Sequence, residues 1–399
     1  MTAIRWALRL ILGLVALCAV LLVLDITTYD RQAVLNDYSR LKQGIAQNYS
    51  NLDWLIEHRK FDPAAHDAAT QSRLDSSLGR VQAYFAIRDF VGGFGDPHLF
   101  IARGTAPAGV QRVGTVSLLE GTGRASDGPD CASAGYETDD RTTSLIYPDM
   151  ARWEPTESTF FPSGVIGGTG FVRIAAFGED QYLDACQIAW KPGLDSRDLQ
   201  LATREVLQSE LRSILQEFTK SGVETVLVDV TGNGGGSEWA SEAAALFASG
   251  ELVRSAVRMP DPQCDRMPIW RGVTVCPIFA AFETGDAGVE TLEGEGVWDG
   301  ALAILVDRNS ASATEAFAVW LHGSNRARLV GERTLGAGCG FIGGGSTVEF
   351  ASLPLHVMIP NCSRFTRDGT NEIEGLAPDV HMQWSNTAKQ EMQTLLDRL

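Results

Sequence analysis

The longest uninterrupted apolar run of this chain lies near its start. It extends from Leu10 to Leu24 and follows two arginines, Arg5 and Arg9. Positive residues before an apolar run are typical of an export signal or a signal anchor. No small-residue cleavage site follows the run, so residues 1–28 are expected to form an uncleaved anchor in the cytoplasmic membrane. The arginines predict a body outside the cytoplasm, periplasmic or extracellular. Secretion after signal cleavage is the alternative.

Residues 31–98 carry large apolar side chains at helical spacing, which predicts a small bundle of three short amphipathic helices. The second helix is expected around Leu74 to Leu78, and the third from Val81 to Val91. A turn rich in glycine and proline ends the bundle and contains Asp96, Pro97 and His98. Residues 99–165 lack a clear period and are interpreted as short strands and loops.

From residue 166 onward, short apolar runs alternate with helical patterns. This alternation predicts parallel βαβ units and therefore an α/β fold over residues 166–385. Residues 250–298 interrupt the alternation as an insertion, two antiparallel strands are expected after residue 346, and residues 386–399 are expected to form a C-terminal helix. The predicted strands are Gly170–Ile174, Thr225–Val230, Ala301–Val306 and Arg328–Gly331, and the predicted helices lie near 199–218, 237–247 and 316–321.

Charge and cysteine content narrow the possible functions. The 399 residues carry a formal net charge of −17, and no basic stripe is present, so nucleic-acid binding is not expected.

Cys18 lies in the apolar run, and an even set of six other cysteines suggests disulfides in an exported domain. Six cysteines allow fifteen pairings. Local pairing favours Cys264–Cys276 and Cys339–Cys362, which leaves Cys131–Cys186. No spacing typical of a metal site occurs.

A serine lies where a predicted buried strand turns into a helix. The stretch from Asn309 to Glu315 follows the strand that begins at Ala301, and it contains Ser310 and Ser312. A hydroxyl at such a turn is exposed beside the first unpaired N–H groups of the helix, which suits a nucleophile with part of its oxyanion hole. The alternative interpretation is that either serine is only a helix N-cap.

A glycine run after the strand at 225–230 offers a second candidate element. Gly234, Gly235 and Gly236 allow close backbone approach to a substrate and leave N–H groups to bind an oxyanion. A tight strand-to-helix turn is the alternative. A phosphate-binding loop is disfavoured because no Lys-Ser/Thr pair follows.

Three ordered segments together resemble the S41 serine peptidases, the family of C-terminal processing peptidases and tricorn core proteases. They are Leu227–Gly236, Asn309–Glu315 and Val330–Gly336, and Gly375–Val380 looks like the closing signature of the family. The resemblance implies a ClpP/crotonase-like core preceded by a helical bundle. It also implies hydrolysis of peptide or protein substrates through an acyl-enzyme, with no cofactor and no metal.

One departure from the family pattern indicates the branch. Ala337 stands where the processing peptidases carry their lysine base, and no PDZ module is recognisable. The tricorn-like branch uses a histidine from the Asp-x-His turn and a late glutamate. The resemblance therefore implies a Ser312–His98–Glu372 arrangement, with Glu374 as the alternative acid.

The resemblance also selects Ser312 over Ser310 as the nucleophile. The expected oxyanion donors are Gly235 or Gly236 together with the N–H of Ala313. Two other functions remain open: a catalytically inactive relative that binds peptide or another ligand, and an esterase-type serine hydrolase. The esterase is disfavoured because Ser312 has no Gly-x-Ser-x-Gly elbow around it.

Overall fold

A computed structural model describes residues 2–103, 111–112, 130–138, 150, 152–260, 288–342, 344–382 and 392. The chain forms two compact units that are discontinuous in sequence. The first contains Met1–Leu118, Pro260–Ile278 and Phe341–Asn361, and the second contains Leu119–Met259, Phe279–Gly340 and Cys362–Leu399. The predicted pair Cys264–Cys276 and the predicted helix at 386–399, Met392 apart, lie outside the described residues.

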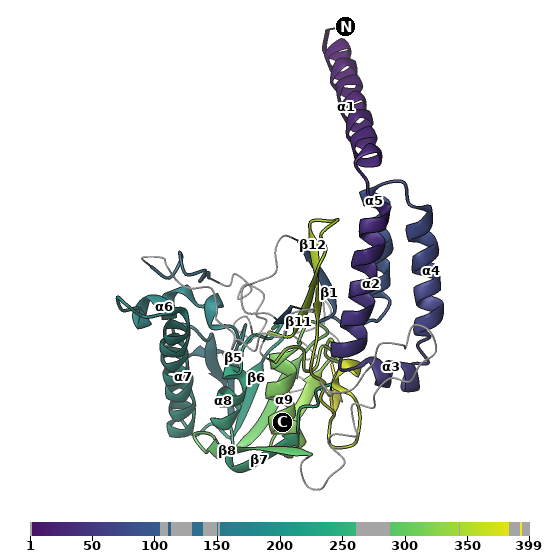
Figure 1. Ribbon diagram of the computed structural model, residues 1–399. Helices are drawn as coiled ribbons and strands as arrows, with labels where there is room; N and C mark the ends of the chain where they lie inside the picture. Colours follow the sequence, from purple (N-terminus) through teal and green to yellow (C-terminus); the bar gives the residue numbers. More distant parts are fainter. Residues whose placement is uncertain are drawn as a thin grey trace. The chain divides into compact units, whose positions relative to one another are not determined.

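The first unit is built from helices and a small sheet (Figure 1). The long helix α1 spans Thr2–Thr27, and the bundle contains α2 (Arg31–Asn48), α3 (Leu52–His58), α4 (Pro63–Ser76) and α5 (Arg80–Gly92). The sheet has the order β1-β12-β11-β2. Its strands are β1 (Phe100–Arg103), β12 (Leu355–Ile359), β11 (Ser346–Glu349) and β2 (Gln111–Arg112). The antiparallel pair β11–β12 confirms the strands expected after residue 346.

The bundle has four helices in its described residues, where the apolar spacing predicted three. The predicted helix at Leu74–Leu78 was wrong, because α4 begins at Pro63 and ends at Ser76. Helix α4 shows little periodic spacing of apolar residues, because it buries only Pro63, Thr70 and Leu74. The better signal was the cap: the Asp62 carboxylate accepts the Ala65 N–H, and proline follows at the first helical position.

Helix α1 contains the apolar run, and its side chains from Ile11 to Ile26 are mostly exposed. Among the described residues, no single helix is long and apolar enough to cross a membrane. One bent pair, Ile11–Thr27 with Arg31–Asn48 at 71°, meets that condition by length and composition only. The structure therefore leaves the expected anchor unconfirmed.

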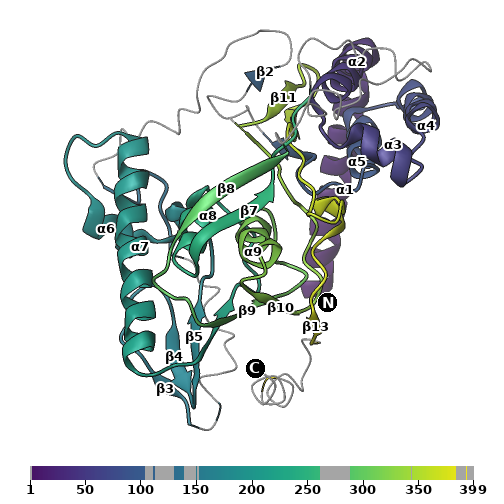
Figure 2. The ribbon, with the colours of Figure 1, turned by 90° about the horizontal axis from the view of Figure 1, so that it is seen from below.

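The second unit is organised around a seven-stranded sheet in the order β13-β10-β9-β6-β5-β4-β3 (Figure 2). Strands β13, β10, β9, β6 and β5 are parallel, and β4 and β3 are antiparallel additions. The βαβ prediction is thus confirmed as a mixed α/β fold with a helical N-terminal region. The strands are β3 (Glu154–Pro155), β4 (Ser163–Ile166), β5 (Thr169–Arg173), β6 (Thr225–Asp229), β9 (Ala301–Val306), β10 (Arg328–Gly331) and β13 (Val380–His381).

Helices cover one face of this sheet and a smaller apolar cluster covers the other, so its central strands are buried on both sides. The helices are α6 (Leu183–Ala189), α7 (Ser196–Lys220), α8 (Trp239–Ala245) and α9 (Ala313–Gly323). The larger core cluster joins α7, α8 and α9 to the sheet, and a smaller one lies on the opposite face. The flanks of the predicted insertion form a two-stranded antiparallel sheet, β7 (Ser249–Ser255) with β8 (Val289–Glu295).

The strand order of the sheet places the segments that follow β6 and β9 next to each other. Strands β6 and β9 are parallel neighbours, with Asp229 opposite Leu305. The glycine loop after β6 and the Ser312 turn after β9 therefore emerge side by side at the carboxyl edge of the sheet. This edge is where open α/β sheets place their ligands.

Candidate active site

Ser312 occupies a strained backbone position at the start of α9. Its φ is 59° and its ψ is −117°, a combination that costs a non-glycine residue on the order of 1–3 kcal/mol and that clusters at functional sites. The residue is partly exposed. Ser310 differs, because it is fully buried, donates to the Val230 carbonyl at 2.9 Å and accepts the Asp307 N–H at 3.0 Å. The hydroxyl of Ser310 is therefore a structural group.

The glycine loop touches the Ser312 turn directly. A Cβ on Gly235 would lie 2.8 Å from the Cβ of Ser312 and 2.9 Å from the Ala313 nitrogen, so only glycine allows this approach. Asn233 links the two segments: its carbonyl accepts the Ala311 N–H at 3.0 Å, and its side-chain oxygen accepts the Gly235 N–H at 2.9 Å. The nucleophile turn and the glycine loop thus form one rigid element.

The candidate oxyanion donors at this element are the N–H groups of Gly236 and Ala313. Within the described part of the chain, neither takes part in a backbone or side-chain hydrogen bond. Ala313 is the first residue of α9, where N–H groups have no intrahelical acceptor. Gly235, by contrast, already donates to Asn233.

Glu315 fastens the turn to the segment that follows β10. One of its carboxylate oxygens accepts N–H groups of Ser312 at 2.9 Å, Ala337 at 3.0 Å and Gly338 at 2.7 Å. The other accepts the Thr334 hydroxyl at 2.5 Å and the Gly336 N–H at 2.9 Å. Burial raises the pKa of the Glu315 carboxyl above its ordinary value, although these donors oppose the shift.

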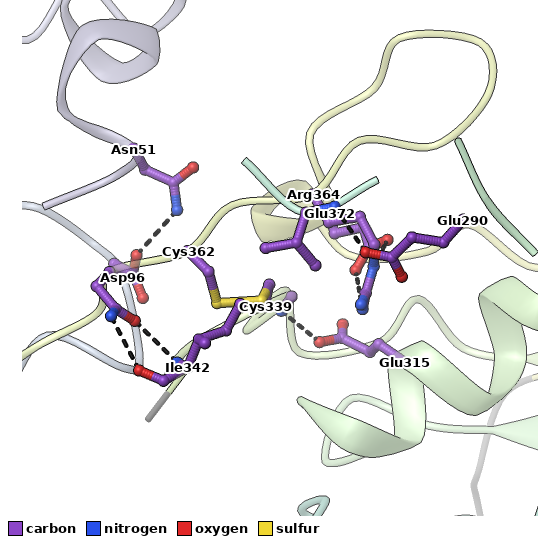
Figure 3. Close-up of a disulfide and its surroundings, with 12 residues drawn as sticks. Asn51, Asp96, Glu290, Glu315, Cys339, Ile342, Cys362, Arg364 and Glu372 are labelled. Carbon is purple, nitrogen blue, oxygen red and sulfur yellow. Dashed lines mark hydrogen bonds and ion pairs between the residues drawn. A yellow bond between two sulfur atoms is a disulfide. The ribbon is translucent and has the colours of Figure 1, made fainter. Parts of the chain in front are cut away.

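Glu372 is buried in the turn η6 (Glu372–Glu374) and is held by Arg364 (Figure 3). The guanidinium donates to both carboxylate oxygens, at 2.6 and 2.7 Å. The Cβ of Glu372 lies 3.0 Å from the place that a Cβ on Gly338 would take, so this acid adjoins the segment that Glu315 binds. Glu374 is exposed.

The charged cluster continues beyond Arg364 to the β7–β8 pair. Arg254 of β7 donates to Glu290 of β8 at 2.8 Å, and its guanidinium carbon lies 4.2 Å from the ring centre of Trp320 in α9. Burial and the nearby charge of Arg364 lower the pKa of Arg254. The insertion is thereby connected to the helix that carries the nucleophile turn.

Two of the three predicted disulfides fall on described residues and both are present. Cys339 bonds Cys362, and Cys131 bonds Cys186. The Cys339–Cys362 bond joins the residue after Gly338 to a residue two positions before Arg364 (Figure 3). Cys339 is therefore a structural half-cystine.

His98 belongs to the first unit, in the turn that precedes β1. The backbone N–H of His98 donates to the Asp96 carboxylate at 2.9 Å, and the centre of the His98 ring lies 5.2 Å from that of Phe341. Asp96 is itself buried and accepts the Tyr49 hydroxyl at 2.9 Å and the Asn51 amide at 3.3 Å. Hydrogen bonds from Tyr49 and Asn51 of the bundle therefore fix the position of the Asp-Pro-His turn.

Glu315 accepts five hydrogen bonds and Arg364 pairs with Glu372, and sequence reasoning assigned neither Glu315 nor Arg364 a role. Glu315 had a readable signal, because a glutamate three residues after a serine marks a capping box. Arg364 had none, since its partner Glu372 is recognisable only after the chain folds.

Comparisons with known proteins bear on the family and the fold of this chain. The family model described as Peptidase family S41 matches residues 168–382, more than half of the chain. The carboxyl-terminal-processing peptidase 3, chloroplastic, of Arabidopsis thaliana is 25% identical over 210 residues, which cover 51% of this chain and 31% of that protein. The chain thus matches about a third of the length of this curated relative.

Two solved structures share the fold over most of the chain. Mature CPAF has a TM-score of 0.60 at 16% identity, over 92% of this chain and 96% of that one. A putative peptidase from Parabacteroides merdae ATCC 43184 has a TM-score of 0.55 at 12% identity, with coverage of 92% and 96%.

Proposed function

The chain belongs to peptidase family S41, a family of serine peptidases, and from this premise we propose that it is an exported serine endopeptidase with Ser312 as its nucleophile. The observation that carries the proposal is the strained turn at Ser312, packed against Gly235. A purely structural N-cap gains nothing from a positive φ, whereas a nucleophile gains exposure and a fixed direction. A ClpP/crotonase-like core is part of the same proposal.

The proposed reaction proceeds through an acyl-enzyme. Ser312 Oγ attacks the peptide carbonyl carbon while the His98 imidazole takes the hydroxyl proton. The N–H groups of Gly236 and Ala313 hold the resulting oxyanion. Collapse of the tetrahedral intermediate breaks the C–N bond, and His98 returns the proton to the leaving amine. A water molecule, deprotonated by His98, then hydrolyses the ester and regenerates Ser312.

Glu372 is the proposed partner of the histidine, with Glu374 as the alternative. A carboxylate that accepts an imidazole N–H fixes the tautomer and stabilises the imidazolium. The ion pair with Arg364 supports this choice, because it fixes the Glu372 side chain in one orientation. Glu374 is exposed to solvent, whereas Glu372 is buried.

The disulfides indicate an extracytoplasmic or exported protein, because such bonds persist in oxidising compartments. We further propose that α1 anchors the chain in a membrane. Its exposed apolar side chains and the preceding arginines support this. The proposed substrates are peptides or proteins, bound as an added strand with little dependence on side chains.

Labelling of the full chain in detergent with a fluorophosphonate probe tests the function. Wild type and Ser310→Ala should label, whereas Ser312→Ala and His98→Ala should not. Glu372→Gln should reduce labelling more than Glu374→Gln. A folded wild type that does not label would refute the nucleophile and leave a peptide-binding protein. Labelling with turnover of a small ester, but of no casein or peptide library, would instead identify an esterase.

A further inference from the structure

Helix α5 is apolar on two faces, and only one of them is used inside the bundle. Its inward face contains Ala83, Ile87 and Phe90, which are fully buried. A second stripe runs along the outside at helical spacing: Leu78 just before the helix, Val81 and Phe85. These three side chains are 58%, 60% and 41% exposed. A helix of a water-soluble bundle ordinarily keeps its outer face polar.

Within the described residues of the bundle, large apolar side chains are exposed along the outer stripe of α5. Among the described residues from 29 to 98, no other large hydrophobic residue is exposed to a similar degree. The stripe, defined by Leu78, Val81 and Phe85, is therefore a local feature and not a general property of this surface.

Helix α5 begins near the end of α1 (Figure 1), and Leu78, the first residue of the stripe, precedes α5 by two positions. The Asp25 carboxylate accepts the Arg80 N–H at 3.1 Å, and the Arg80 guanidinium donates to the hydroxyl and carbonyl of Thr28 at 2.6 and 2.7 Å. The Tyr29 hydroxyl adds a contact to Ser77 at 2.5 Å. These contacts attach the last turn of α1 to the turn between α4 and α5. The exposed apolar surface of α1 and the stripe on α5 are thus adjacent parts of the first unit.

We propose that the stripe on α5 is a membrane-contacting surface, occupied by the interfacial region of the same bilayer that receives α1. This inference rests on the proposed anchor. The argument is continuity: the apolar run of α1 ends one residue before Asp25, and Asp25 packs against Gly79, next to Leu78. A bilayer that covers α1 up to its last turn reaches the start of α5.

The charges beside the stripe suit a lipid headgroup layer. Arg80 remains partly exposed after its contacts with α1. Arg88, one helical turn beyond Phe85, places its guanidinium carbon 4.6 Å from the centre of that ring. Arginine heads over an apolar stem and ring are typical of side chains that extend from hydrocarbon toward phosphate groups. Arg88 also pairs with Asp89 at 2.7 Å, and Arg80 lies 3.9 Å from Asp25. The surface therefore combines an apolar stripe with two partly exposed arginine–aspartate pairs.

The consequence is a fixed attachment of the bundle to the membrane. With α1 alone, the bundle would pivot on the residues after Thr27. With α1 and the stripe both engaged, the start of α5 is held at the headgroup layer, and the axis of the bundle takes a defined direction relative to the bilayer. Insertion of apolar side chains near the interface adds to the anchoring of α1.

Photo-crosslinking in the full chain tests the inference. A benzophenone amino acid replaces Val81 or Phe85, and the protein is reconstituted in vesicles of phosphatidylcholine with phosphatidylglycerol. Leu17 in α1 provides the positive control. Ala64, exposed near the start of α4, provides the matched negative control, because twelve residues of helix place it about 18 Å from the end of α4 that adjoins the stripe. Circular dichroism of each variant reports folding, and fluorophosphonate labelling reports the proposed activity.

The expected result is lipid adducts at positions 81 and 85, at least about five-fold more abundant than at position 64, as an interfacial location requires. Adducts at position 17 but not at 81 or 85 would refute membrane contact by the stripe and support the proposed anchor. Crosslinked dimers through 81 or 85 would also overturn it and identify a second copy as the occupant. No lipid adduct at position 17 would overturn the anchor and the stripe together. Labelling of Ser312 stays unchanged in every case unless the proposed function is itself wrong.

Discussion

Gly235→Ala should damage the proposed active site, because the glycine loop has no room for a side chain at this position. The new Cβ would lie 2.8 Å from the Ala311 carbonyl oxygen and 2.8 Å from the Ser312 Cβ. Ordinary contact between carbons is about 3.5 Å, so the two segments must separate by about 0.7 Å. The φ of 106° at this residue adds backbone strain for any L side chain.

The expected cost has two parts. Overpacking of a tight site costs about 1–3 kcal/mol, and the disfavoured φ adds about 1–2 kcal/mol. A total near 3 kcal/mol corresponds to a fall in melting temperature of about 6–12 °C for a unit of this size. Separation of the nucleophile from its oxyanion donors should slow fluorophosphonate labelling by about 100-fold, since displacements approaching 1 Å have this effect.

Circular dichroism melting and the time course of labelling measure both quantities. Gly234→Ala is the matched control, because a Cβ there meets nothing within 4 Å and its φ is not in the left-handed region. It should melt and label within error of the wild type. A Gly235→Ala protein that melts and labels like the Gly234→Ala control would refute the close packing of the glycine loop on the Ser312 turn.

Two further substitutions test the buried charges. Arg364→Met leaves the Glu372 carboxylate buried without its cation and should lower the free energy of unfolding by about 3–5 kcal/mol; a urea midpoint within about 0.3 M of wild type would contradict the ion pair, given typical denaturant slopes. Glu315→Gln should remove a pH dependence of the folding stability. Burial raises the folded-state pKa of Glu315, so its ionisation costs folding free energy. The contribution of this group to wild-type stability is therefore highest at low pH and falls as the pH rises from the ordinary carboxyl range through the raised pKa. The melting temperature of wild type minus that of the variant, followed from pH 4 upward, should decline through that window, and a difference that stays constant with pH would contradict the shift.

The sequence predicted the second unit well because its signals are local. Buried parallel strands are short apolar runs, and the helix after β9 begins at a serine with a glutamate three residues later. Helix α4 was misplaced because a helix that buries only three residues carries little apolar period. The sequence signal for the start of α4 was the N-cap Asp62 followed by Pro63.

Side-chain partnerships at the site were not predictable in the same way. The exposure of Ser312 and the burial of Ser310 depend on which hydroxyl meets the Val230 carbonyl, a contact across 80 residues. The ion pair of Arg364 with Glu372 and the five donors of Glu315 likewise depend on loops that meet only in the folded chain. Residue types at a motif therefore identified the candidates, and the tertiary structure distinguished structural groups from reactive ones.

The Cys339–Cys362 bond makes a closed covalent ring out of residues 339–362. The chain passes from the second unit into the first at Gly340–Phe341 and returns at Asn361–Cys362, so both crossings lie beside the two half-cystines. A single cut of the backbone within 340–361, by the protein itself or by another peptidase, would leave the two fragments joined by this disulfide. Such a nicked protein would migrate at full length without reductant and separate into two fragments with it, and only the reduced form would free β11 from β12 along the backbone.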